Sequence, residues 1–131
     1  MKAFSAHWKS SKQPRKQRKY RFRAPLHVRH AMMAAPLSKA LRKKYKKRNM
    51  PVRKGDRVRI MVGKHKKQTG VIGHVDLREM RITIEGIQVT RKDGTSMPVP
   101  FQPSNLEIIE LVLTDKKRME VLQQHAHQAP Q

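Results

Sequence analysis

The segment VRKGDRVRIMVGKHKKQTGVIGHV, residues 52–75, decides the fold of this chain because its apolar residues recur at every second position. Val58, Ile60 and Val62 alternate with the residues between them, and this period predicts a half-buried strand. The loop GKHKKQTG follows at residues 63–70, and a second short apolar run begins directly behind it. The segment therefore predicts two strands joined by a basic loop.

Short apolar runs separated by glycines continue behind this segment. The first, GVIGHV, predicts a strand with Val71, Gly73 and Val75 on one face, and MRITIEG predicts the next, with Ile82 and Ile84 inward. A hairpin is then predicted in which an Asp93-Gly94 turn joins Ile87–Arg91 to Thr95–Phe101. LEIIELVL predicts the last strand. Five or six short strands of this kind suggest a small closed barrel, because a flat sheet would leave its edges and one face exposed. The predicted fold class is mainly β.

Helical patterns flank these strands. Pro25 suits a first helical turn ahead of LHVRHAMMAA, and PLSKALRKKYKK places Leu37, Leu41 and Tyr45 on one face. Behind the strands, a Thr-Asp pair can cap a closing helix in DKKRMEVLQQ, and HAHQAPQ is expected to form a frayed tail. We expect three parts: a basic extension with short helices (residues 1–50), the barrel (51–113), and a C-terminal helix with its tail (114–131).

Charge is distributed unevenly along the 131 residues. The chain has 31 Lys and Arg against 9 Asp and Glu, a formal net charge of +22. Residues 1–55, called the arm below, hold 19 of the basic residues and no acid, so the rest of the chain is nearly balanced. Such a charge opposes compaction unless a polyanion neutralises it, and nucleic acid is the commonest polyanion in a cell. Only 37% of residues are hydrophobic and 5% aromatic, which is little for a large core.

The run KSSKQPRKQRKYRFR, from Lys9 to Arg23, cannot bury enough apolar surface to fold alone. We therefore expect it to be extended until it meets its partner. Its cations can neutralise phosphates, while Trp8, Tyr20 and Phe22 can stack on unpaired bases. A solvated tail without a target is the alternative, and three aromatic residues among so many charges argue against it.

The candidate RNA contacts are basic, histidine and aromatic side chains of the arm, the basic loop and the hairpin tip. In chain order they are Lys9, Lys12, Arg15, Lys16, Arg18, Lys19, Tyr20, Arg21, Phe22, Arg23, His27, Arg29, His30, Lys39, Arg42, Lys43, Lys46, Lys47, Arg48, Arg53, Lys54, Lys64, His65, Lys66, Lys67, Arg91 and Lys92. Gly63 and Gly70 are expected to allow positive φ and to let the loop's backbone approach a partner closely, and Gly55 is the third motif glycine. The loop is thus predicted to be a phosphate-facing tip.

Several classes of function are disfavoured by the residues. The absence of cysteine excludes a disulfide framework and thiolate zinc sites, and is compatible with a reducing cytosol. The N-terminus MKAFSAHWKSSKQ lacks the apolar region of a secretory signal, and no run approaches the ~18 apolar residues that span a bilayer. The acids are scattered singly, with no nucleophile elbow and no GxxxxGK[ST] loop, so no enzyme is indicated.

Two histidine pairs and one basic helix raise further alternatives. His27-x-x-His30 has helical spacing for two metal ligands, but neither a cysteine nor a nearby carboxylate would complete the site. RNA contact or simple exposure is favoured there, and His125-x-His127 has even less support, so no metal or cofactor is expected. The basic helix in residues 36–47 could lie on an anionic membrane, but its apolar stripe is narrow and has no Trp or Phe anchor. No membrane partner is expected.

Residues 52–75 resemble the KOW motif, which is a strand, a Gly- and Lys-rich loop, and a second strand started by a glycine, here Gly70. Many family members have glycine where this chain has Lys67. Outside the motif, APLHVRHAMMAAPLSKALRKKYKKRNMPVRKGD, DGTSMPVPFQPSNLEI and the closing DKKR resemble the archaeal and eukaryotic type of ribosomal protein L twenty-four, called L twenty-six in eukaryotes. The resemblance runs from about Ala24 to Arg118, and the preceding stretch shares the family's basic character.

The resemblance implies an SH3-like barrel with N- and C-terminal extensions in a structural protein of the large ribosomal subunit. It also implies binding to the 5′ region of large-subunit rRNA early in assembly, near the nascent-peptide tunnel exit of cytoplasmic ribosomes. Implied partners are that rRNA, neighbouring large-subunit proteins and factors acting at the exit. A KOW elongation factor would normally carry a polymerase-binding domain, for which this chain offers no residues. A DNA-compacting protein would usually show Ala/Lys-rich repeats, which this chain lacks.

Overall fold

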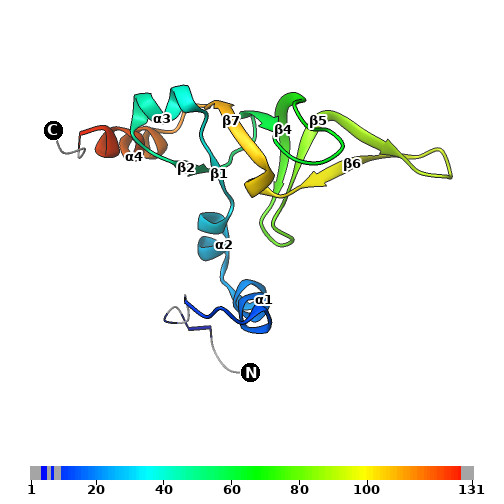
Figure 1. Cartoon of the computed structure of the whole chain (residues 1–131), viewed down its shortest axis with the longest axis horizontal. Coiled ribbons are helices and arrows are strands. Elements are labelled where there is room, and N and C mark those ends of the chain that lie inside the picture. Colours follow the sequence, from blue (N-terminus) through cyan, green and yellow to red (C-terminus); the bar gives the residue numbers. More distant parts are fainter. Residues whose placement is uncertain (1–3, 6, 8–9, 128–131) are drawn as a thin grey trace.

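A computed structural model describes residues 4–5, 7 and 10–127, and the larger of its two sheets has five antiparallel strands (Figure 1). The strands lie in the order β6-β5-β4-β3-β7, and the connection after β6 brings β7 back beside β3. Their bounds are β3 Arg57–Ile60, β4 Thr69–Asp76, β5 Arg81–Thr90, β6 Ser96–Phe101 and β7 Leu106–Glu110. The predicted mainly β fold is confirmed.

The inward side chains of this sheet follow the alternation in the sequence. Val58 and Ile60 in β3, and Ile82 and Ile84 in β5, are at most 2% exposed. Register shifts interrupt the β3–β7, β4–β5 and β5–β6 ladders. Because such bulges bend a strand and increase its twist, the sheet curves round its core into a small barrel-like domain with β6 and β7 as its edge strands.

Three details differ from the predicted strands. β3 ends at Ile60, and Val62 is 59% exposed because the chain has already turned into the basic loop. In β4, Ile72 reaches the core while Val71 is exposed, and the bulge behind Ile72 breaks the expected alternation of one face. The predicted third strand and the first arm of the hairpin are one strand, β5, which pairs with β6 across the predicted Asp93-Gly94 turn.

Helices and a two-stranded sheet lie on either side of these strands in the chain. They are α1 (Pro14–Arg23), α2 (Leu26–Met32), β1 (Ala34–Pro36), α3 (Lys39–Tyr45), β2 (Asn49–Pro51), the 3-10 helix η1 (Pro103–Asn105) and α4 (Lys116–His127). Helices are found where they were predicted in α2, α3 and α4. The predicted first helix is wrong for Ala34 and Ala35, because α2 ends at Met32 and these residues form β1, which pairs with β2. α4 runs to His127, three residues into the predicted frayed tail, and the rest of that tail lies outside the described residues.

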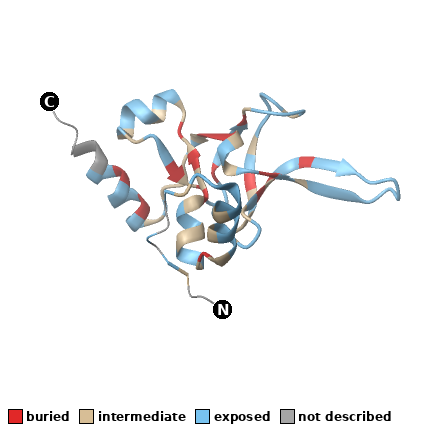
Figure 2. Cartoon of the chain, turned by 60° about the horizontal axis from the view of Figure 1, so that its bottom comes forward, coloured by how far each residue is buried: buried red, intermediate tan, exposed pale blue. Residues whose placement is uncertain are grey.

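The segment from α2 to β2 packs on the same core as the barrel. Met33, Ala35 and Leu37 are fully buried in one cluster with the inward residues of the sheet. β1 pairs with β2, and Leu37 forms a bridge with Ile108 of β7. Figure 2 shows the buried residues gathered where these elements meet, whereas the distal part of the β5–β6 hairpin is exposed. The barrel and the second half of the extension thus share one core.

The prediction of an extended chain from Lys9 to Arg23 is wrong for Pro14–Arg23, which forms α1. Pro14 occupies the first helical turn, where its fixed φ is favourable, and the Lys, Arg and Gln residues behind it have good helix propensity. None of the residues of α1 is buried. Its end is instead held by polar contacts, because the guanidinium of Arg29 donates to the backbone carbonyls of Phe22 and Ala24.

A buried ion pair fastens α4 to the barrel. The side chains of Asp56 and Arg118 are 0% and 4% exposed, and Arg118 Nη2 lies 2.6 Å from Asp56 Oδ2. The carboxylate also accepts hydrogen bonds from the backbone N–H groups of Arg53 and Val112, both at 2.9 Å. Arg118 further donates to the carbonyls of Val112 and Pro51. The pair therefore joins α4, the end of β2, the turn before β3 and the chain behind β7.

Candidate nucleic-acid interface

α1 presents most of its cations to solvent. Phe22, in its last turn, is 76% exposed and has a free ring face for stacking on a base. Tyr20 instead packs against Phe4, with ring centroids 4.9 Å apart. The predicted contacts Trp8 and Lys9 lie outside the described residues. The predicted basic contacts here are the exposed Lys12, Arg15, Arg18, Lys19 and Arg21 and the half-buried Lys16 and Arg23.

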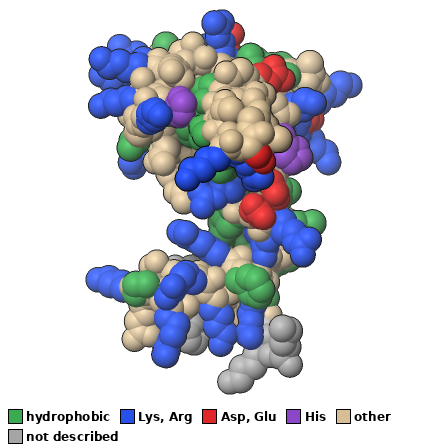
Figure 3. All heavy atoms as spheres, turned by 90° about the vertical axis from the view of Figure 1, so that its right-hand side faces the viewer, with side chains coloured by type: hydrophobic (Ala, Val, Ile, Leu, Met, Phe, Trp, Pro, Cys, Tyr) green, Lys and Arg blue, Asp and Glu red, His purple; other side chains and the backbone are tan. Residues whose placement is uncertain are grey.

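Figure 3 shows blue Lys and Arg side chains over much of the lower lobe, which holds α1. His27 and His30 are exposed on α2. Arg29 differs, because its guanidinium also donates to the carbonyl of Arg78 at 2.7 Å, in the turn between β4 and β5. With its bonds to the end of α1, this side chain joins the arm to the barrel, and its predicted RNA contact stays a prediction.

The cations of α3 form a second exposed group. Arg42 faces solvent for part of its length while its Nε donates to the carbonyl of Leu37 at 2.6 Å. Burial lowers the pKa of the half-buried Lys47 because it removes water from the ammonium group. Lys46 has φ +49, the left-handed conformation that ends the helix. The other predicted contacts of this group, Lys39, Lys43 and Arg48, are exposed.

The basic loop between β3 and β4 is closed by backbone hydrogen bonds. Lys67 N–H donates to the carbonyl of Ile60 at 2.8 Å, and Gly63 takes φ +96. Lys67 itself has φ +72, so a non-glycine residue adopts the left-handed conformation at the position where many KOW proteins have glycine. The loop thereby presents the side chains of Lys64, Lys66 and Lys67 to solvent.

His65, the fourth predicted side chain of this loop, lies inward of the lysines. Its ring packs edge-on against Phe101 with centroids 6.1 Å apart, and its Nδ1 lies 3.2 Å from Gln68 Oε1. Because these contacts hold the ring on the barrel, His65 anchors the loop beneath its three exposed lysines.

Gly70 has a different role from the one predicted. Positive φ occurs at Gly63 but not at Gly70. A Cβ on Gly70 would lie 2.4 Å from Ile84 Cγ2, a distance that real side chains do not tolerate. The glycine is therefore required because β4 and β5 approach closely within the barrel. The predicted positive φ is wrong for Gly70, and the predicted close approach of the loop to a partner stays a prediction. Gly55, the third motif glycine, takes φ +93 in the turn before β3.

The remaining predicted contacts lie at the turn before β3 and at the hairpin tip. Arg53 pairs with Asp115 at 2.6 Å, while Lys54 is exposed. At the tip, Arg91 and Lys92 are exposed, far along the chain from the basic loop. The predicted contacts among the described residues thus lie on α1, α2, α3, the turn before β3, the loop and the hairpin, and are spread over several elements.

Two arginines that the sequence did not single out lie beside the arm. Arg78 and Arg81, from the β4–β5 turn and the start of β5, line a hollow together with Arg18 and Arg21 of α1. Their position depends on Arg29, which spans 49 residues to reach the carbonyl of Arg78. A contact over that separation has no local signal, so periodicity and charge counting could not find this group.

No group of three or more His, Asp or Glu residues that could hold a metal ion occurs in the part of the chain that the structure describes. Among the same residues, no helix is long and apolar enough to cross a membrane.

Comparison with known proteins agrees with a basic barrel-like domain carrying helical extensions. A family model that describes the eukaryotic ribosomal proteins L twenty-six and the archaeal ribosomal proteins L twenty-four matches residues 11–125. A large ribosomal subunit protein uL24 from Methanothrix thermoacetophila is 50% identical over 111 residues, covering 85% of this chain and 96% of the relative. One of the same name from Methanospirillum hungatei is 46% identical over 112 residues, covering 86% and 93%.

These matches define the class, which is that of ribosomal proteins. Within that class, the chain belongs to the family that unites the eukaryotic ribosomal proteins L twenty-six with the archaeal ribosomal proteins L twenty-four. The predicted resemblance is confirmed. The matched region begins at residue 11 and so includes α1, for which the sequence alone showed only a shared basic character.

Proposed function

We propose that this protein is a structural constituent of the large ribosomal subunit and binds large-subunit rRNA through its arm and its basic loop. The observation that carries the proposal is an arm with 19 basic residues and no acid, folded into short helices whose cations mostly face solvent. Such a surface needs a polyanion to neutralise it. The relatives' name, large ribosomal subunit protein, favours rRNA as that polyanion.

The parts of the chain would act differently on the RNA. The proposed division is an rRNA-binding extension at residues 1–50, a barrel at 51–113, and a C-terminal helix with its tail at 114–131. The barrel would dock as a rigid body and present Lys64, Lys66 and Lys67 to phosphates. α1 buries none of its residues, so RNA that neutralises its cations would also stabilise the helix. Binding would therefore combine electrostatic capture with local ordering of the arm.

The family likeness supports finer proposals about place and time. The protein would bind the 5′ region of large-subunit rRNA early in assembly and lie near the nascent-peptide tunnel exit of cytoplasmic ribosomes. Its partners there would be neighbouring large-subunit proteins and factors that act at the exit. No catalytic step and no cofactor is part of this proposal.

A salt titration tests the electrostatic part. If about ten phosphates are neutralised, the affinity for a 5′-region rRNA fragment should fall with salt with a log–log slope of about −7 to −9. Filter binding across a series of KCl concentrations measures that slope. A slope near −2 would show that few phosphates are contacted and would contradict the model.

The loop can be tested apart from the arm. The triple variant K64A/K66A/K67A should weaken binding and flatten the slope by about 2 to 3, because three phosphate contacts are lost. Lys116 and Lys117 on α4 are also exposed but are not proposed contacts, so K116A/K117A is the matched control and should keep the parental slope. Equal slopes for both variants would remove the loop from the interface.

Co-sedimentation tests the ribosomal assignment itself. The native protein should sediment with large subunits and stay bound after a moderate salt wash. Loss from ribosomes combined with retention on RNA polymerase would instead favour a KOW elongation factor.

A further inference from the structure

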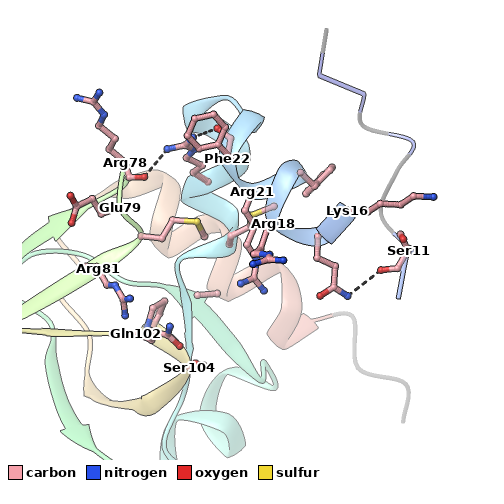
Figure 4. Close-up of a pocket in the computed structure, with 17 residues that line it drawn as sticks. Ser11, Lys16, Arg18, Arg21, Phe22, Arg78, Glu79, Arg81, Gln102 and Ser104 are labelled. Carbon is pink, nitrogen blue, oxygen red and sulfur yellow. Dashed lines mark hydrogen bonds between the residues drawn. The ribbon is translucent and has the colours of Figure 1, made fainter. Parts of the chain in front are cut away.

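A hollow of about 730 Å³ lies between α1 and the barrel. Figure 4 shows its walls: α1 on one side, and the β4–β5 turn with residues behind β6 on the other. Arg29 holds the two walls together through the backbone carbonyls of Phe22 and Arg78. The volume falls in the range of about 300–1,000 Å³ that is usual for ligand pockets. The hollow is therefore a built feature of suitable size for one small occupant.

Its charged side chains favour an anionic occupant. Arg18 and Arg21 of α1 lie across the hollow from Arg81, while Arg78 and one acid, Glu79, stand at its rim with side chains that point away from it (Figure 4). Each of these arginines is exposed, and none forms an ion pair with an acid of the described residues. Guanidinium groups bind phosphate oxygens well because their planar forks match two oxygens at once.

Phosphate alone does not account for the rest of the lining. Phe22, Met32 and Met80 add apolar and aromatic surface, and Gln102 and Ser104 add an amide and a hydroxyl. Flat apolar faces suit the π-face of a base, and amide and hydroxyl groups suit its polar edges. A nucleotide combines these three requirements, whereas a simple anion or an acidic peptide uses only the arginines.

We propose that this hollow binds a single-stranded segment of RNA, one or two unpaired nucleotides. Their bases pack against Phe22 and Met80, and their phosphates meet Arg18, Arg21 and Arg81. A double helix does not fit this description, because its bases are stacked inside and its deep groove is narrow. The inference rests on the proposed function, since it takes RNA as the ligand, and it adds which structural state of RNA the arm and barrel recognise together.

The test compares one variant on two RNAs. Fluorescence anisotropy measures the binding of the full chain to a labelled single strand of about 12 nucleotides and to an RNA duplex of the same length at equal salt. Replacing Phe22 by Ala removes the stacking face, which should weaken single-strand binding by roughly 5- to 150-fold and leave duplex binding unchanged. Ala also favours the helix, and Phe22 is mostly exposed, so F22A folds like the parent.

Two matched variants show what the loss means. F22Y keeps an aromatic face and should retain parental affinity for the single strand. Val89 is an exposed apolar residue on the hairpin, 52% accessible and outside the hollow, so V89A should change neither affinity. An F22A protein that binds the single strand as well as the parent does, or that loses equal affinity for both RNAs, would overturn the proposal.

Position and ligand class are tested separately. Photo-crosslinking with a 5-iodouridine single strand, read by mass spectrometry, should modify Tyr20 or Phe22, and crosslinks confined to His65 would overturn the site. A competition experiment tests the ligand class. If an oligoglutamate of equal charge displaces the labelled single strand as well as unlabelled RNA does, the hollow binds any polyanion and the proposal is overturned. None of these outcomes would change the steep salt dependence with which the parent protein binds rRNA. If the proposed function were wrong, the parent protein itself would bind rRNA with a shallow salt slope.

Discussion

Removing the buried guanidinium of Arg118 should destabilise this protein far more than removing one from its surface. In R118M the carboxylate of Asp56 stays in the core, 0% exposed, and keeps only the two backbone N–H donors. Breaking a buried pair on one side leaves an uncompensated charge and costs about 3–5 kcal/mol. The carbonyls of Pro51 and Val112 lose their donor as well, so the value should lie in the upper part of that range.

Urea unfolding followed by circular dichroism measures this loss, with moderate salt to screen the net positive charge. At a slope of about 1.5 kcal/mol per M urea, the midpoint should fall by about 2–3 M. The matched control is Arg57, which pairs with Glu110 at 3.5 Å on the surface, where the two side chains are 52% and 65% exposed. R57Q should cost about 0–1 kcal/mol, because solvent screens that pair.

Limited proteolysis gives a second measurement of the same perturbation. Arg118 fastens α4 together with the buried Leu122, so cleavage behind Lys116 and Lys117 should become much faster in R118M and stay parental in R57Q. The reasoning would be refuted by an R118M midpoint that falls no further than that of R57Q. The double variant D56N/R118M should be less destabilised than the sum of the single variants, because neither partner is then left as an unpaired charge.

Three further outcomes are expected. G70A should lower the stability by about 1–3 kcal/mol in thermal unfolding, because its Cβ would lie 2.4 Å from Ile84 Cγ2 and force β4 away from β5; an unchanged melting temperature would contradict this close packing. K67G should keep or raise the stability by up to about 1 kcal/mol, because glycine relieves the left-handed φ of +72, yet it should flatten the salt slope of RNA binding by about 0.7–0.9; a clear loss of stability would show that the conformation carries no strain. The hydroxyl and the backbone N–H of Thr95 donate to the Asp93 carboxylate and hold the pKa of Asp93 below the ordinary 3.8, so these bonds stabilise the hairpin turn above that pH and are lost as the pH falls through the lowered pKa. T95A should bring the pKa of Asp93 back toward 3.8 in an NMR titration. An unmoved pKa would refute the assignment.

The local pattern predicted the strands well. Val58, Ile60, Ile82 and Ile84 are buried as their spacing indicates, because a strand alternates its side chains whatever lies around it. The pattern failed at Val71 and Val62. Hydrogen-bonding with neighbouring strands sets both the bulge behind Ile72 in β4 and the end of β3 at Ile60. Neither feature can be predicted from the few residues around it.

The arm shows a second limit of sequence reasoning. Its charge predicts no fold of its own, yet Pro14–Arg23 is helical in the structure. The helix buries no side chain and depends on the contacts of Arg29 and of the Phe4–Tyr20 ring pair. The residues of Pro14–Arg23 have a helix propensity that allows a helix but is too weak to form one alone. These tertiary contacts therefore decide whether the segment is helical.

The sequence by itself determined the unequal charge of arm and barrel, the mainly β fold class and most cations of the candidate interface, since composition and periodicity are local properties. Only the tertiary structure decided how those cations are used. Arg29 donates to a backbone carbonyl of the β4–β5 turn, and Arg53 pairs with Asp115. Arg78 and Arg81 become neighbours of α1 and line the hollow with it. Such contacts join residues about fifty or more positions apart, and their formation depends on the path of the folded chain.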